Sequence, residues 1–85
     1  MKLATVKNLF VRILADGKIS IGEYLNAKWH NATTPFKKND EIAWGIFREN
    51  VRAFQRRTGR TVAFISKSPT VPQEIISKLE SCKLN

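Results

Sequence analysis

One stretch of the chain, Asp40–Thr58, constrains the fold more than any other, because its apolar residues repeat with the spacing of an α-helix. The residues that would share its buried face are Ala43, Phe47, Val51 and Phe54. Asn39 is a suitable N-cap, and Asp40 and Glu41 place negative charge in the first turn, where the helix dipole favours it. Gly59 suits the left-handed position that often ends a helix. The sequence therefore predicts a helix here with one buried side.

The other side of this predicted helix carries arginines. Arg48, Arg52 and Arg56 recur every fourth residue and would form one stripe along the helix. Guanidinium groups suit phosphates and base edges, so the stripe predicts contact with nucleic acid. The candidate nucleic-acid-binding residues are the stripe, its neighbours and two lysines before the helix: Arg48, Arg52, Arg56, Gln55, Arg57, Arg60, Lys37 and Lys38. The alternative is a solvated face on which the arginines pair with nearby acids.

The residues before Asn31 predict two shorter helices. Within Thr5–Ala15, the residues that follow the helical pattern of one buried stripe are Val6, Leu9, Phe10, Ile13 and Leu14. Asp16 and Gly17 would end that helix. Ser20 and Glu23 have the spacing of a capping box, which predicts a second helix over Ser20–His30.

The C-terminal part predicts one strand and one more helix. Thr61–Ser66 is rich in β-branched and aromatic residues and predicts a short strand. A lone strand needs a partner, for which Lys18–Ile21, a second copy and another protein are the candidates. A last helix would begin near Pro72 and present an apolar side made of Ile75, Ile76, Leu79 and Cys82. We therefore expect a mainly α fold, in which residues 1–85 form a single small basic helical domain of three to four helices with one short β-strand.

The order of these predicted helices resembles a helix-turn-helix layout, with the arginine-bearing helix in the place of the recognition helix. The connection Asn31–Lys38 has eight residues, whereas a helix-turn-helix uses about three or four. We therefore expect a looser helix-turn-helix-like or winged variant. A further apolar face of the long helix, made of Ile42, Ile46 and Ala53, is expected to pack under the C-terminal helix, with a homodimer as the alternative.

The charge balance favours an anionic partner. The chain of 85 residues has a formal net charge of +8 and a pI of about 10.2, which is typical of nucleic-acid-binding domains and also of proteins that bind acidic protein surfaces. The single cysteine excludes an internal disulfide and fits a reducing compartment. No apolar stretch approaches the roughly 20 residues of a membrane span. We expect a cytoplasmic protein that does not bind membranes.

Nothing in the sequence indicates catalysis or a cofactor. His30 and Cys82 are the only histidine and cysteine, too few for a metal site without other ligands. Asp16–Glu23 resembles the second half of a calcium loop, but Arg12 and Leu14 would occupy ligand positions and carry no carboxylate. We expect no enzyme activity, no metal and no cofactor.

From these patterns we predict a small non-enzymatic accessory or regulatory protein that binds nucleic acid, DNA in preference to RNA, through the arginine-striped helix. The alternative is a protein-interaction module, such as a small inhibitor or adaptor from a phage or other mobile element. In that case the basic surface would meet an acidic protein, and Thr61–Ser66 could accept a partner strand.

Overall fold

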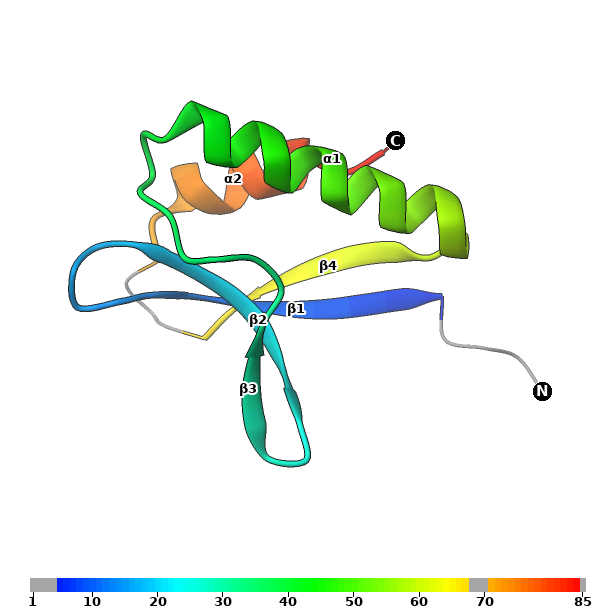
Figure 1. Ribbon diagram of the computed structural model, residues 1–85, viewed down its shortest axis with the longest axis horizontal. Coiled ribbons are helices and arrows are strands. Elements are labelled where there is room, and N and C mark those ends of the chain that lie inside the picture. The colour runs from blue at the N-terminus through cyan, green and yellow to red at the C-terminus, as the bar shows by residue number, and fades with distance from the viewer. Residues whose placement is uncertain (1–4, 68–70, 85) are drawn as a thin grey trace.

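The chain forms a four-stranded β-sheet with two helices on one of its faces, as Figure 1 shows for the computed structural model. The structure describes residues 5–67 and 71–84. Its elements in chain order are β1 (Val6–Ile13), β2 (Ile19–Leu25), β3 (Lys28–Asn31), α1 (Glu41–Thr58), β4 (Thr61–Ser66) and α2 (Gln73–Ser81). The strand order is β3-β2-β1-β4, with β4 parallel to β1 and the other pairs antiparallel.

This α+β architecture contradicts the mainly helical fold that we expected from the sequence. The predicted helix Thr5–Ala15 is strand β1, and the predicted helix Ser20–His30 is the hairpin of β2 and β3. Both periods fit β1, because Leu9 and Ile13 lie four residues apart as on a helix and alternate with Val11 as in a strand. In the structure Leu9 and Val11 are buried under the helices.

The residues expected to form helix ends belong instead to the hairpins. The Ser20 hydroxyl accepts a hydrogen bond from Arg12 Nε at 3.3 Å rather than forming a capping box. Gly17 does adopt a positive φ of 87°, but in the turn between β1 and β2. Asn26 and Ala27, both with positive φ, form the turn into β3. No helix precedes α1 in the described chain, so the helix-turn-helix-like and winged expectations are also wrong.

Most local sequence signals of the C-terminal half agree with the structure, but the N-cap of α1 does not. The N-cap is Asp40 rather than the expected Asn39, because the Asp40 side chain accepts from the Ala43 amide at 3.0 Å. Gly59 ends the helix with a φ of 69°, as expected. Strand β4 has the predicted bounds, but its partner is β1 rather than Lys18–Ile21. The C-terminal helix is present as α2.

One apolar core lies between the sheet and the two helices. Its buried side chains are Leu9, Val11, Ile19, Ile21, Phe36, Trp44, Phe47, Val51, Val62, Phe64, Ile75, Leu79 and Cys82. Phe47 on α1 lies between Phe36 and Phe64, with ring centres 6.3 and 6.0 Å away. Ile42 and Ile46 remain 79% and 56% exposed, so the expectation that α2 covers them is wrong.

Candidate nucleic-acid interface

The arginines of α1 differ in their exposure and in their contacts with the rest of the protein. Arg48 and Arg56 are exposed, whereas Arg52 is half-buried. Arg48 Nε lies 3.8 Å from a carboxylate oxygen of the adjacent Glu49, and Arg56 forms no ion pair with any described residue. The exposed members of the stripe are therefore Arg48 and Arg56, and Arg56 is the one whose charge is not offset.

Arg52 and Gln55 hold the C-terminal segment against α1. Arg52 Nε donates to the carbonyl oxygen of Cys82 at 3.1 Å, at the end of α2 where a positive charge complements the helix dipole. Gln55 is only 9% exposed, and its side-chain oxygen accepts from the Leu84 amide at 2.8 Å. Both side chains are thus engaged in a tertiary contact, which the sequence did not indicate because their partners lie about 30 residues further along the chain.

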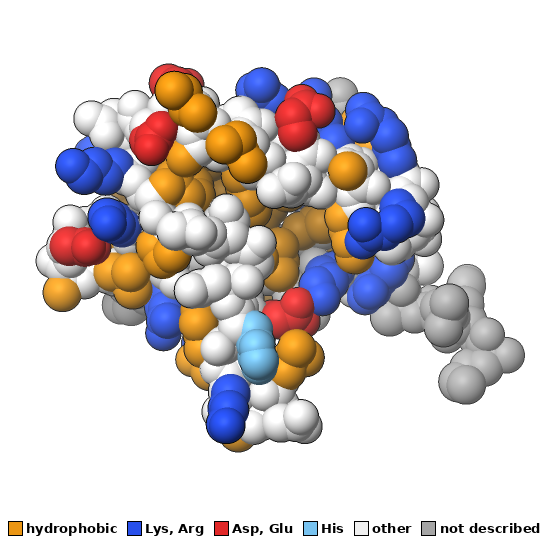
Figure 2. Space-filling model, in the orientation of Figure 1, with side chains coloured by type: hydrophobic (Ala, Val, Ile, Leu, Met, Phe, Trp, Pro, Cys, Tyr) orange, Lys and Arg blue, Asp and Glu red, His pale blue; other side chains and the backbone are white. Residues whose placement is uncertain are grey.

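The cations at the C-terminal end of α1 come together around one aromatic ring. Lys7, Arg57 and Arg60 have their charged groups 6.0, 5.8 and 5.8 Å from the centre of the Phe54 ring. Arg60 also donates from Nη2 to the Val6 carbonyl at 3.2 Å, and Lys7 pairs with Glu23 at 2.6 Å. Figure 2 shows Lys and Arg side chains gathered over this end of the molecule. We call Lys7, Arg57 and Arg60 the basic cluster.

Lys37 and Lys38 lie at the opposite end of α1. Both are exposed, but the helix between them and the basic cluster has 18 residues, or about 27 Å of length. The structure therefore does not gather the eight candidate residues into one patch. Arg56 and Arg57 lie in the last turn of α1, and Arg60 follows shortly after the helix. The two lysines precede the helix and lie at its other end.

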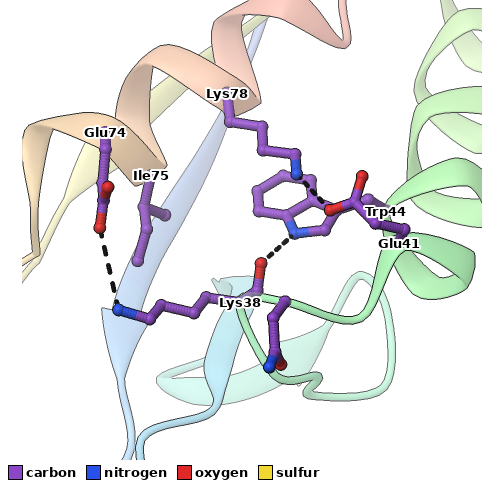
Figure 3. A pocket seen from close by; sticks show the side chains of 7 residues that line it. Lys38, Glu41, Trp44, Glu74, Ile75 and Lys78 are labelled. Atoms are coloured by element: carbon purple, nitrogen blue, oxygen red, sulfur yellow. Dashed lines mark hydrogen bonds and ion pairs between the residues drawn. The ribbon is translucent and has the colours of Figure 1, made fainter.

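A notch of about 390 Å³ opens beside these lysines, between the start of α1 and α2 (Figure 3). Its cations are already paired: Lys38 lies 3.9 Å from Glu74, and Lys78 lies 2.6 Å from Glu41. The indole nitrogen of Trp44 donates to the Lys38 carbonyl at 2.8 Å, which ties the loop to the helix. The four charged side chains of the notch therefore form two pairs of opposite charge, and these contacts connect α1 and the loop before it to α2.

Sequence reasoning missed a group of aromatic residues on the sheet face that the helices leave open. Phe10, Tyr24 and Trp29 come from three neighbouring strands, and their rings form a chain with centre-to-centre distances of 6.2 and 5.2 Å. Arg12 stacks its guanidinium 3.9 Å from the centre of the Trp29 indole. Alternate residues along a strand share one face, so this alternation could have predicted that the three rings lie together. It was not decisive here because the same segments also match the spacing of a helix.

The remaining reactive side chains show no catalytic arrangement. Cys82 is a buried free thiol, and its burial raises the pKa against the opposing effect of Arg48, Arg52 and Lys78, which keeps it in the unreactive thiol form. Among the described residues, no three of His, Cys, Asp and Glu gather as they would around a metal ion. Neither described helix is long and apolar enough to cross a membrane.

The comparisons with known proteins identify no relative. No family model matches the sequence, and no curated protein or solved structure is significantly similar to it. The chemistry of the surface is therefore the basis for assigning a function.

Proposed function

We propose that this chain is a small, non-enzymatic accessory or regulatory protein that binds nucleic acid through the exposed arginines at the C-terminal end of α1. The observation that carries the proposal is that Arg56 and Arg57 lie in the last turn of α1, where Arg57, Arg60 and Lys7 also surround the Phe54 ring, in a protein with a net charge of +8. Arg56 and Arg57 form no ion pair with the described residues. Unpaired guanidinium groups on a helix are suited to phosphate oxygens.

The shape of this surface favours DNA over RNA. An exposed helix fits the wide major groove of B-DNA, whereas the major groove of A-form RNA is too narrow for side chains to read. Arg48 and Arg56 lie on the exposed part of α1 and would contact phosphates or base edges there. The cytoplasm, as a reducing compartment, is the location that suits the lone free cysteine.

The test is binding of a mixed-sequence DNA duplex and of RNA, followed as a function of salt. Replacing Arg56 and Arg57 by Ala should weaken binding and lower the slope of log K against log salt by about 0.9 for each phosphate that the variant no longer neutralises. The matched control is Lys18→Ala with Lys83→Ala, which removes the same charge from two lysines that are paired with Asp16 and Glu80. The proposal fails if the wild-type protein shows no affinity at low salt, or if both double variants weaken binding by the same amount.

A second function, binding to an acidic protein, is favoured by the position of β4. Among the described strands, β4 lies at an edge of the sheet and pairs only with β1, and an edge strand can accept a strand from a partner. A small inhibitor or adaptor from a phage or other mobile element would use such an edge. A partner that stays bound after nuclease treatment, together with no binding to purified nucleic acid, would favour this function. A homodimer through the exposed Ile42 and Ile46 also stays a prediction.

A further inference from the structure

We infer that the open face of the β-sheet is a second binding surface, which takes the unpaired bases of a single-stranded nucleic acid. The inference rests on the proposed nucleic-acid function and adds a distinct surface and a distinct substrate class to it. This surface lies on the face opposite α1 and α2, so the arginines of α1 do not belong to it (Figure 1). We call it the open face.

The strand registers define which residues belong to the open face. Phe10 pairs with Gly22 and Ile65, Arg12 pairs with Ser20, and Tyr24 pairs with Trp29. Paired residues point to the same side of a sheet, and alternate residues along each strand join them. The side chains of this face that matter for binding are Phe10, Arg12, Tyr24, Trp29, Ile65 and Lys67.

The rings on the open face are accessible and held in place. Tyr24 is 47% exposed, and Trp29 meets it edge-on with an interplanar angle of 76°. The Trp29 indole donates to Asn31 Oδ1 at 2.7 Å. It also lies against Gly22, where a Cβ would come within 2.9 Å of two indole carbons. Tyr24 is thus the ring that a base can reach, and Trp29 is its support.

Two cations accompany the rings, and the described strands place no acid beside them. The Arg12 guanidinium stacks on Trp29, and Lys67 Nζ lies 5.3 and 5.6 Å from the ring centres of Phe10 and Tyr24. Glu23 is the one carboxylate in the four described strands. It pairs with Lys7, which contacts Phe54 on the helix-covered side. The open face is therefore apolar and positively charged.

This combination matches single-stranded nucleic acid better than other partners. An unpaired strand repeats a flat aromatic base and a negative phosphate, and proteins bind it by stacking bases on aromatic or guanidinium planes within a basic surface. Duplex DNA keeps its bases stacked inside and offers the open face only phosphates. An acidic peptide supplies the charge but no row of flat rings, so Tyr24 would contribute less to its binding.

The experiment measures fluorescence anisotropy of labelled single-stranded DNA and RNA of about 12 nucleotides, within the roughly 4–16 that single-strand binding surfaces cover. Replacing Tyr24 by Ala should weaken single-strand binding roughly 5- to 150-fold, because one base can no longer stack. Tyr24→Phe keeps the ring and should keep the affinity within about twofold. Ile42→Ala, which truncates an exposed apolar side chain on α1, is the control for a nonspecific decrease in affinity.

The duplex assay separates this inference from the proposed function. Tyr24→Ala should leave duplex affinity unchanged, whereas the variant lacking Arg56 and Arg57 should lose it. If single strands bind but Tyr24→Ala and Lys67→Ala leave that binding unchanged, the inference is overturned and the proposed function stands. If the protein binds neither single strands nor duplex, both are overturned, and an acidic protein becomes the partner to seek.

Discussion

Arg52 and Arg56 occupy equivalent places in the sequence, yet the structure predicts opposite consequences for their removal. Arg52 donates to the Cys82 carbonyl and connects α1 to the end of α2, whereas Arg56 is exposed. We expect Arg52→Ala to lower the free energy of unfolding while Arg56→Ala leaves it nearly unchanged. In nucleic-acid binding we expect the reverse order.

The size of the Arg52 effect follows from its interactions. A hydrogen bond to a charged group contributes about 1.5–3 kcal/mol, and a cation at a helix C-terminus about 0.3–1 kcal/mol. Because Arg52 is only half-buried, solvent screens part of both interactions. We therefore expect Arg52→Ala to decrease the free energy of unfolding by about 1–2 kcal/mol. For a domain of this size that corresponds to a decrease in Tm of about 4–16 °C.

The assay is thermal unfolding followed by circular dichroism, with duplex binding measured on the same samples below their Tm. Arg52→Lys is the informative control, because it keeps the charge near the end of α2 but lacks the guanidinium Nε donor, and it should fall between wild type and Arg52→Ala. The reasoning is refuted if Arg52→Ala and Arg56→Ala unfold at the same temperature. It is refuted equally if Arg56→Ala is the less stable of the two.

Three further predictions address the rest of the fold. Gly22→Ala should destabilise the protein by about 1–3 kcal/mol or more, because the new Cβ would lie against the His30 carbonyl oxygen; a Tm equal to wild type in a thermal melt would contradict the strand packing. Ile42→Ala with Ile46→Ala should change the free energy of unfolding by about 0.5 kcal/mol or less in urea, since both side chains are exposed, whereas a decrease of several kcal/mol would mean that they are buried. Burial raises the pKa of the Cys82 thiol in the folded protein above its ordinary value. The contribution of the buried thiol to the free energy of unfolding is therefore fully present below the ordinary pKa, and it is lost as the pH rises through the folded-state pKa. Urea titrations across alkaline pH should therefore show the wild type losing stability relative to Cys82→Ser, and alkylation of the native thiol should be much slower than in denaturant; equal pH profiles or equal alkylation rates would contradict the buried site.

The elements predicted well are those whose signals are local. Helix α1 is recognisable from its apolar spacing and from Gly59, and β4 from its run of β-branched and aromatic residues. The candidate site could be predicted only in part. Arg56 and Arg57 are exposed, as contact with nucleic acid requires, whereas Arg52 and Gln55 are held by the C-terminal segment.

The segments before α1 are predicted wrongly because the spacing of their apolar residues fits both an α-helix and a β-strand. Leu9 and Ile13 satisfy a helix, and with Val11 they also satisfy a strand, so local pattern alone does not choose between them. The strand conformation is decided by pairing between strands. The backbone N–H and C=O groups of β4 need hydrogen-bond partners, and β1 provides them along Val6–Val11. Once β1 is a strand, β2 and β3 complete the sheet as hairpins.

The sequence by itself determined that the chain is strongly basic, that α1 has one buried and one arginine-bearing side, where α1 ends, and where β4 begins and ends. These properties depend on residues close together in the chain. Only the tertiary structure decided that β1 to β3 form a sheet, that Arg52 and Gln55 serve the fold, and that Phe10, Tyr24 and Trp29 share one open face. The physical reason is that hydrogen bonds between strands and contacts across the core join residues distant in sequence, and no local spacing records them.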